Sequence, residues 1–170
     1  IEGVTQALAN KAKMASYEKA YGKILETNFK DTTPEDTETV NAEGRYLLPS
    51  FIELHAHGGG GFDVADSTKE AFQGVMDTHL AHGVTLLCPT LVASEWSKTI
   101  EFLKFCGEFG KSHPMFGGAH LEGPFLSPVM CGAQNLSRII TPTAEMTAEL
   151  AELASVISCI TAAPENEGCE

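Results

Sequence analysis

The chain has 170 residues, of which 43% are hydrophobic and 20% are charged, so it is long and apolar enough to bury a core. Its 11 basic and 23 acidic residues give a net charge of -12, which argues against nucleic acid or an anionic membrane as a partner. No apolar run approaches the ~18 residues of a membrane-spanning helix. The five cysteines are scattered and lack a C-x-x-C pair, so we expect a reducing, cytoplasmic location.

The two ends of the chain point to a longer protein. The sequence begins at Ile1 rather than Met and stops at Glu170, shortly after an apolar segment. Residues 7–20 are rich in Ala and Lys and have the composition of a helix, although their apolar positions keep no clean period. Short strands are predicted at residues 22–29 and 39–46, and the second of them ends in a turn.

Residues 47–57 form an apolar segment that ends in two histidines, and we interpret it as a buried strand. Side chains alternate between the faces of a strand, so Glu53, His55 and His57 are expected to point the same way. Two imidazoles at positions i and i+2 can bind one divalent metal ion. The glycines at 58–61 allow a sharp turn beside them. The alternative is two polar residues at a strand end without a metal.

After this segment, predicted strands alternate with predicted helices. Apolar runs predict further strands at residues 84–88, 115–122 and 156–161. Amphipathic segments between the strands predict helices, with N-caps at Ser67, Ser94 and Thr141. Strands separated by helices imply a parallel sheet. This pattern corresponds to about half of a (β/α)8 barrel, and a small open α/β sheet is the alternative.

The third predicted strand ends in His120 and Glu122. The carboxyl ends of parallel strands in a barrel meet at one mouth, so Glu122 is expected beside His55 and His57. A carboxylate and two imidazoles make a site suited to zinc or iron. Taken alone, Glu122 has the alternative role of capping a loop or helix. His120 lies deeper along the strand, and we expect it to be hydrogen-bonded behind the ligands rather than to bind the metal.

Several of these motifs resemble those of a known enzyme family. Residues 49–58 resemble the opening motif of the amidohydrolase superfamily, although Ser50 stands where that family usually has Gly. Further stretches look like the signature of the N-acetylglucosamine-6-phosphate deacetylases within it. These stretches are residues 120–126, 132–134 and 162–165. The resemblance covers about residues 22–166.

The resemblance implies a fold. It is an α/β fold: a partial (β/α)8 TIM barrel, with about the first four strands in residues 47–170. Part of a small β-sandwich is expected before it, within an N-terminal segment of residues 1–46. Full-length members of the family are usually homo-oligomers, and we expect the same of the whole protein. A half barrel leaves apolar strand edges uncovered, so self-association or pairing with a missing half is also expected.

The resemblance also implies site residues. His55, His57 and Glu122 match metal ligands of the family, with zinc or iron as the expected ion. Ala133 and Gln134 match residues that contact the sugar, although many members have His at the position of Gln134. The general base of the family is an aspartate on a late barrel strand, and further histidine ligands come from strands five and six. No catalytic residue of that kind is expected within this chain.

The implied reaction is hydrolysis of the N-acetyl group of N-acetylglucosamine 6-phosphate, which yields glucosamine 6-phosphate and acetate. A bound divalent metal would activate water and polarise the amide carbonyl. Because the base is expected downstream, the isolated chain is predicted to be inactive. Two alternatives remain open. The first is another metal-dependent hydrolase of the superfamily, and the second is a noncatalytic truncated paralogue that binds sugar or a partner.

Overall fold

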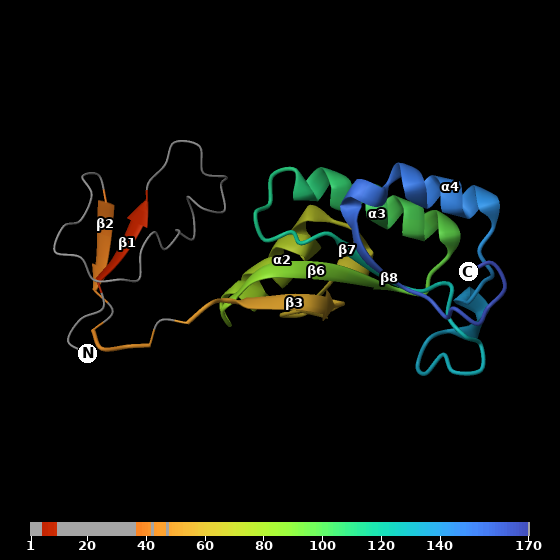
Figure 1. Ribbon diagram of the computed structural model, residues 1–170, viewed down its shortest axis with the longest axis horizontal. Coiled ribbons are helices and arrows are strands. Elements are labelled where there is room, and N and C mark those ends of the chain that lie inside the picture. The colour runs from red at the N-terminus through yellow and green to blue at the C-terminus, as the bar shows by residue number, and fades with distance from the viewer. Residues whose placement is uncertain (1–4, 10–36, 42, 47, 170) are drawn as a thin grey trace. The chain divides into compact units, whose positions relative to one another are not determined.

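The computed structural model describes residues 5–9, 37–41, 43–46 and 48–169 (Figure 1). The chain divides into two units, Ile1–Ser50 and Phe51–Glu170. In the first unit, strand β1 (Thr5–Ala9) pairs antiparallel with strand β2 (Thr37–Asn41). The helix predicted at residues 7–20 is therefore wrong at residues 7–9, which belong to strand β1, and the rest of it lies outside the described residues. The strand predicted at residues 22–29 also lies outside the described residues.

The second unit is an α/β structure built on a four-stranded parallel sheet in the order β3-β6-β7-β8. The strands are β3 (Phe51–Ala56), β6 (Val84–Val92), β7 (Ala119–Glu122) and β8 (Ile157–Thr161). The helices between them are α2 (Lys69–Leu80), α3 (Trp96–Gly110) and α4 (Ala144–Glu152). The predicted alternation of strand and helix is therefore confirmed, and the sheet order follows the chain order.

Shorter elements complete this unit. A small hairpin joins β4 (Gly58–Gly59) to β5 (Phe62–Asp63) directly after the two histidines. Three 3-10 turns follow along the chain, namely η1 (Val64–Asp66), η2 (Leu136–Arg138) and η3 (Ala154–Val156). Among the residues that the structure describes, no helix is long and apolar enough to cross a membrane.

The predicted helix caps are wrong by one or two residues. Thr68 caps α2, because its hydroxyl accepts a hydrogen bond from the Ala71 N–H, while Ser67 closes η1. Thr143 rather than Thr141 caps α4. Glu95 precedes α3 without a side-chain cap, and the Ser94 hydroxyl donates to the Val92 carbonyl instead. Neighbouring Ser and Thr residues have similar capping ability, so tertiary packing selects among them.

The core lies between the sheet and the helices, and Figure 1 shows α3 and α4 on the same side of that sheet. Phe72 of α2 is fully buried, and its ring contacts three phenylalanine rings of α3. The centroids lie 6.0 Å from Phe102, 4.8 Å from Phe105 and 5.1 Å from Phe109. This aromatic cluster packs α2 against α3.

The prediction that the histidine strand is buried is wrong. Among the strands that the structure describes, β3 pairs with β6 alone and so forms an edge of the sheet, and its apolar side chains are largely exposed. Phe51, Ile52 and Leu54 are 65%, 60% and 66% exposed, whereas Ala56 is buried. An apolar run of this kind is typical of a strand covered on both faces, so its exposure leaves an apolar surface at this edge.

The third strand is shorter than the predicted residues 115–122. Only Ala119–Glu122 pair as β7, because Gly118 has φ +95° and breaks the extended backbone. Before that break, Leu87 and Phe116 form an isolated parallel bridge. The short strand still carries both His120 and Glu122 into the sheet.

Candidate metal centre

Three side chains converge at the carboxyl ends of β3 and β7. The Nε2 atoms of His55 and His57 lie 3.0 Å apart. Oε2 of Glu122 lies 3.4 Å from Nε2 of His55 and 3.2 Å from Nε2 of His57. Two imidazole nitrogens and one carboxylate oxygen within 4.8 Å of one another form a group that could hold a metal ion. The structure therefore brings together the three residues predicted as ligands.

The sheet explains why residues so distant in sequence meet. β3 and β7 both run parallel to β6, which lies between them. Ala56 pairs with Pro89 of β6, and Glu122 pairs with Val92. Parallel strands end at the same edge, so side chains at their carboxyl ends gather there. The three side chains are partly exposed, at 45%, 42% and 25% for His55, His57 and Glu122, so a small molecule can reach them.

The glycine run shapes the turn beside the histidines. Gly60 and Gly61 have φ values of +61° and +89°, which favour glycine. A Cβ atom on Gly58 would collide with the carbonyl oxygen of Phe62. The Val64 N–H donates to the His57 carbonyl at 2.9 Å and closes the turn. The predicted sharp turn after the histidines is confirmed.

The donor atoms fit a cation. Nδ1 of His57 lies 2.9 Å from the carbonyl oxygen of Thr90, which can only accept a hydrogen bond. The proton of a neutral His57 ring therefore sits on Nδ1, and Nε2 presents a lone pair toward His55 and Glu122. A lone pair that faces a carboxylate oxygen at 3.2 Å is an arrangement that a divalent cation would stabilise.

His120 lies behind this group and is buried. Its Nδ1 is 3.2 Å from the Thr90 hydroxyl and its Nε2 is 2.8 Å from the Thr161 hydroxyl. Burial, followed by the charge of His55, lowers the pKa of His120, while Glu122 acts in the opposite direction. Both ring nitrogens have partners within the protein, which agrees with a hydrogen-bonded histidine rather than a ligand.

The structure holds Gln134 close to the same edge of the sheet. Its side-chain oxygen accepts a hydrogen bond from the Ala93 N–H at 3.0 Å, and Ala93 directly follows the end of β6. Ala133 is exposed. An ion pair of 2.6 Å between Arg138 and Glu95 holds the same loop. The sequence did not predict the ion pair between Arg138 and Glu95. It also did not predict that Thr90 and Thr161 contact His120, because both are polar residues within apolar segments.

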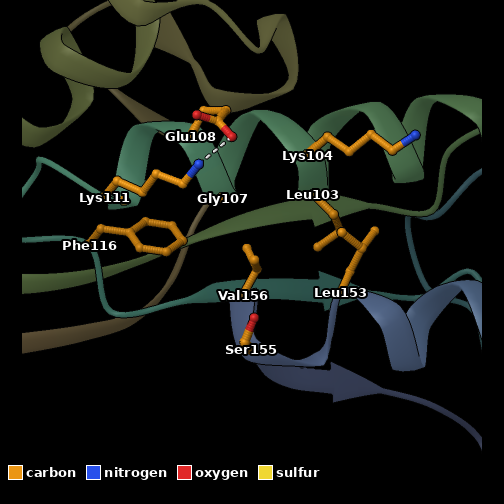
Figure 2. A pocket seen from close by; sticks show the side chains of 10 residues that line it. Leu103, Lys104, Gly107, Glu108, Lys111, Phe116, Leu153, Ser155 and Val156 are labelled. Atoms are coloured by element: carbon orange, nitrogen blue, oxygen red, sulfur yellow. Dashed lines mark hydrogen bonds and ion pairs between the residues drawn. The ribbon is translucent and has the colours of Figure 1, made fainter.

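A separate groove of about 660 Å³ lies between α3 and the segment around η3 (Figure 2). Leu103, Leu153 and Val156 give it an apolar lining, and Lys111 and Glu108 form an ion pair of 2.6 Å at its edge. None of the residues that line this groove belongs to the metal group or to the predicted sugar contacts. The candidate centre is therefore at the end of the strands and not in this groove.

Comparison with protein-family models finds no match. Curated relatives do match. An N-acetylglucosamine-6-phosphate deacetylase from Caenorhabditis elegans is 33% identical over 88% of this chain and 39% of its own length. Another from Danio rerio is 33% identical over 85% of this chain and 38% of its own. The chain thus spans about two fifths of the length of these relatives.

Solved structures show the same likeness. The N-acetylglucosamine-6-phosphate deacetylase of Pasteurella multocida superposes with a TM-score of 0.75 and 29% identity, over 80% of this chain and 36% of that one. A mutant of the Mycobacterium smegmatis enzyme in complex with N-acetyl-D-glucosamine-6-phosphate gives a TM-score of 0.66 and 28% identity, over 72% and 32%. By sequence and by structure, this chain is related over most of its length to the N-acetylglucosamine-6-phosphate deacetylases.

Proposed function

We propose that this chain supplies part of the active site of a metal-dependent N-acetylglucosamine-6-phosphate deacetylase. The observation that carries the proposal is the convergence of His55, His57 and Glu122 on one point at the carboxyl ends of two parallel strands. The substrate would be N-acetylglucosamine 6-phosphate, and the products glucosamine 6-phosphate and acetate. The names of the relatives support this assignment over another reaction of the amidohydrolase superfamily.

We propose the corresponding fold for the whole protein. Residues 47–170 would contribute about the first four strands of a (β/α)8 barrel, and residues 1–46 would contribute to a small β-sandwich. The sheet order, which follows the chain order, supports this reading. The exposed apolar side chains of β3 support a barrel that would cover both faces of this strand. A homo-oligomeric, cytoplasmic enzyme remains our expectation.

In this proposal each residue has a defined task. His55 and His57 would hold a zinc or iron ion through Nε2, and Glu122 would hold it through a carboxylate oxygen. When bound, such an ion lowers the pKa of water and polarises an amide carbonyl. Ala133 and Gln134 would position the sugar beside it. The general base is expected from a part of the enzyme beyond the barrel strands described here, which is why the chain alone is predicted to be inactive.

Calorimetric titration with Zn²⁺ tests the proposal. We expect the purified chain to bind one ion, and we expect His57→Ala to weaken binding by at least about tenfold. His82→Ala is the matched control, because His82 is an exposed histidine after α2 whose Nδ1 contacts the Thr78 carbonyl and not the metal group. Equal zinc affinity for the wild-type chain and the His57→Ala variant would refute the proposed centre. It would favour a noncatalytic chain.

A further inference from the structure

We propose that Thr90 is a positioning residue that orients the candidate metal ligands. This inference rests on the proposed metal centre and adds a residue to it. Thr90 lies in β6, between the two strands that carry the ligands, and is only 1% exposed. Its main-chain carbonyl contacts Nδ1 of His57, and its side-chain hydroxyl contacts Nδ1 of His120.

The carbonyl of Thr90 sets the orientation of His57. It accepts the hydrogen bond from Nδ1 of His57 at 2.9 Å. A carbonyl oxygen cannot donate, so this contact keeps the proton on Nδ1 and leaves Nε2 free for a metal ion. The hydrogen bond also fixes the rotation of the ring, which places Nε2 at 3.2 Å from the Glu122 carboxylate.

The hydroxyl of Thr90 determines which nitrogen of His120 carries its proton. It has three partners, namely the Ala56 N–H at 3.1 Å, the Cys88 carbonyl at 3.1 Å and Nδ1 of His120 at 3.2 Å. The Ala56 N–H can only donate, and the Cys88 carbonyl can only accept the single hydroxyl proton. All three contacts are satisfied only if Nδ1 of His120 donates. Nε2 of His120 then accepts from the Thr161 hydroxyl at 2.8 Å.

This network reaches both histidine ligands. Ala56 lies between His55 and His57 in the chain, so the hydrogen bond from its N–H holds the backbone that carries them. The ring of His120 contacts the ring of His55 edge-on, with centroids 4.9 Å apart and planes at 84°. His57 is therefore held directly by Thr90, while His55 is held through Ala56 and His120.

Removal of the hydroxyl should weaken the centre without removing a ligand. The Thr90→Val variant keeps the shape of the side chain and the carbonyl that binds His57. It leaves the Ala56 N–H and Nδ1–H of His120 buried without a partner. We expect its affinity for Zn²⁺ to fall by about 10- to 100-fold, the usual cost of losing a group that orients a metal ligand. Thr90→Ser keeps a hydroxyl and should restore most of the affinity.

The matched control is Thr99→Val in α3. Thr99 is also only 1% exposed, and its hydroxyl donates to the Glu95 carbonyl, away from the ligands. This variant loses a buried hydroxyl in the same way, so it should retain wild-type zinc affinity. A loss of affinity in Thr99→Val equal to that in Thr90→Val would overturn the specific role of Thr90, because general destabilisation would then explain both.

Nitrogen-15 NMR of the histidine side chains gives a readout that needs no variant. In the metal-free wild-type chain at neutral pH, we expect His120 to carry its proton on Nδ1, with Nε2 unprotonated. A proton on Nε2 instead would overturn the proposed network. Failure of the wild-type chain to bind zinc would refute the metal centre, whereas wild-type affinity in Thr90→Val would refute only the role of Thr90.

Discussion

Oε2 of Glu122 lies 3.2 Å from Nε2 of His57, although β7, which carries Glu122, does not pair with β3, which His57 directly follows. β6 separates the two strands and sets their register through Ala56–Pro89 and Val92–Glu122. The contact therefore depends on the pairing of three strands, β3, β6 and β7, and not on a local turn. A change at either residue should affect metal binding more than folding, because both side chains are partly exposed.

We predict that Glu122→Gln lowers the affinity of the chain for Zn²⁺ by at least about tenfold. The amide keeps the shape of the side chain but removes the negative charge that faces the two histidines. Glu152→Gln at the exposed end of α4 is the control, since it makes the same change in net charge far from the ligands. Calorimetric titration would compare the two, and equal affinities would contradict a ligand role for Glu122.

A second prediction concerns the loop that carries Gln134. Gln134→Ala removes the acceptor of the Ala93 N–H, so hydrogen exchange at that amide should become about 2- to 10-fold faster. Gln134→Glu keeps an oxygen acceptor and should retain most of the protection. Mass spectrometry of peptides that cover residues 93 and 127–136 measures both. Unchanged exchange in Gln134→Ala would show that the side chain does not hold the loop.

Stability should depend on the aromatic cluster around Phe72. Phe72→Ala removes a fully buried ring that contacts Phe102, Phe105 and Phe109, and should cost about 3–5 kcal/mol in the free energy of unfolding. Phe51→Ala on the exposed edge strand should cost about 0.5 kcal/mol or less. Urea denaturation measures the two changes, and similar losses would contradict the exposure of β3.

Stability should also fall in mild acid because of His113. Its ring stacks on Phe109 at 4.7 Å, and its Nδ1 is buried without a hydrogen-bond partner. Burial lowers the pKa of His113, and Asp77 partly opposes this shift. The unfolded chain therefore takes up the proton at a higher pH than the folded chain. The contribution of His113 to the free energy of unfolding is therefore complete above the ordinary histidine pKa of about 6.5, and it is lost as the pH falls through and below that value.

His113→Phe tests this dependence, because it keeps an aromatic ring against Phe109 and removes the titrating group. When the pH is lowered from about 7.5 to about 5.5, the free energy of unfolding measured with urea should fall more for the wild-type chain than for the variant. His120 titrates in the same direction, so the variant should retain part of the pH dependence. An identical loss in both proteins would exclude His113 as a contributor.

The isolated chain should release no acetate from N-acetylglucosamine 6-phosphate, even with zinc or iron present. The residues proposed here would hold the metal and the sugar, but the base that moves the proton is expected elsewhere in the enzyme. An enzyme-coupled acetate assay with a full-length relative as the positive control measures this. Acetate release by the chain that is abolished in His57→Ala would show that the described residues suffice for catalysis.

Much of this arrangement could be predicted from local sequence. Hydrophobic periodicity predicted the four strands of the sheet and the three helices, because the periods of strand and helix are properties of neighbouring residues. The spacing of His55 and His57 and the position of Glu122 at a strand end were enough to place all three at one edge. Helix starts could not be placed to the residue from sequence, since Ser67 and Thr68 offer the same capping chemistry and only packing distinguishes them.

Other features depended on the tertiary structure. An apolar run cannot reveal whether a strand is central or at an edge, so the exposure of Ile52 and Leu54 became visible only in the sheet. The contacts of Thr90 with His57 and His120, and that of Gln134 with Ala93, join segments far apart in the chain. Sequence determined which groups could bind a metal, because ligand chemistry belongs to the side chain. Tertiary structure decided how those groups are oriented, because orientation comes from partners on other strands.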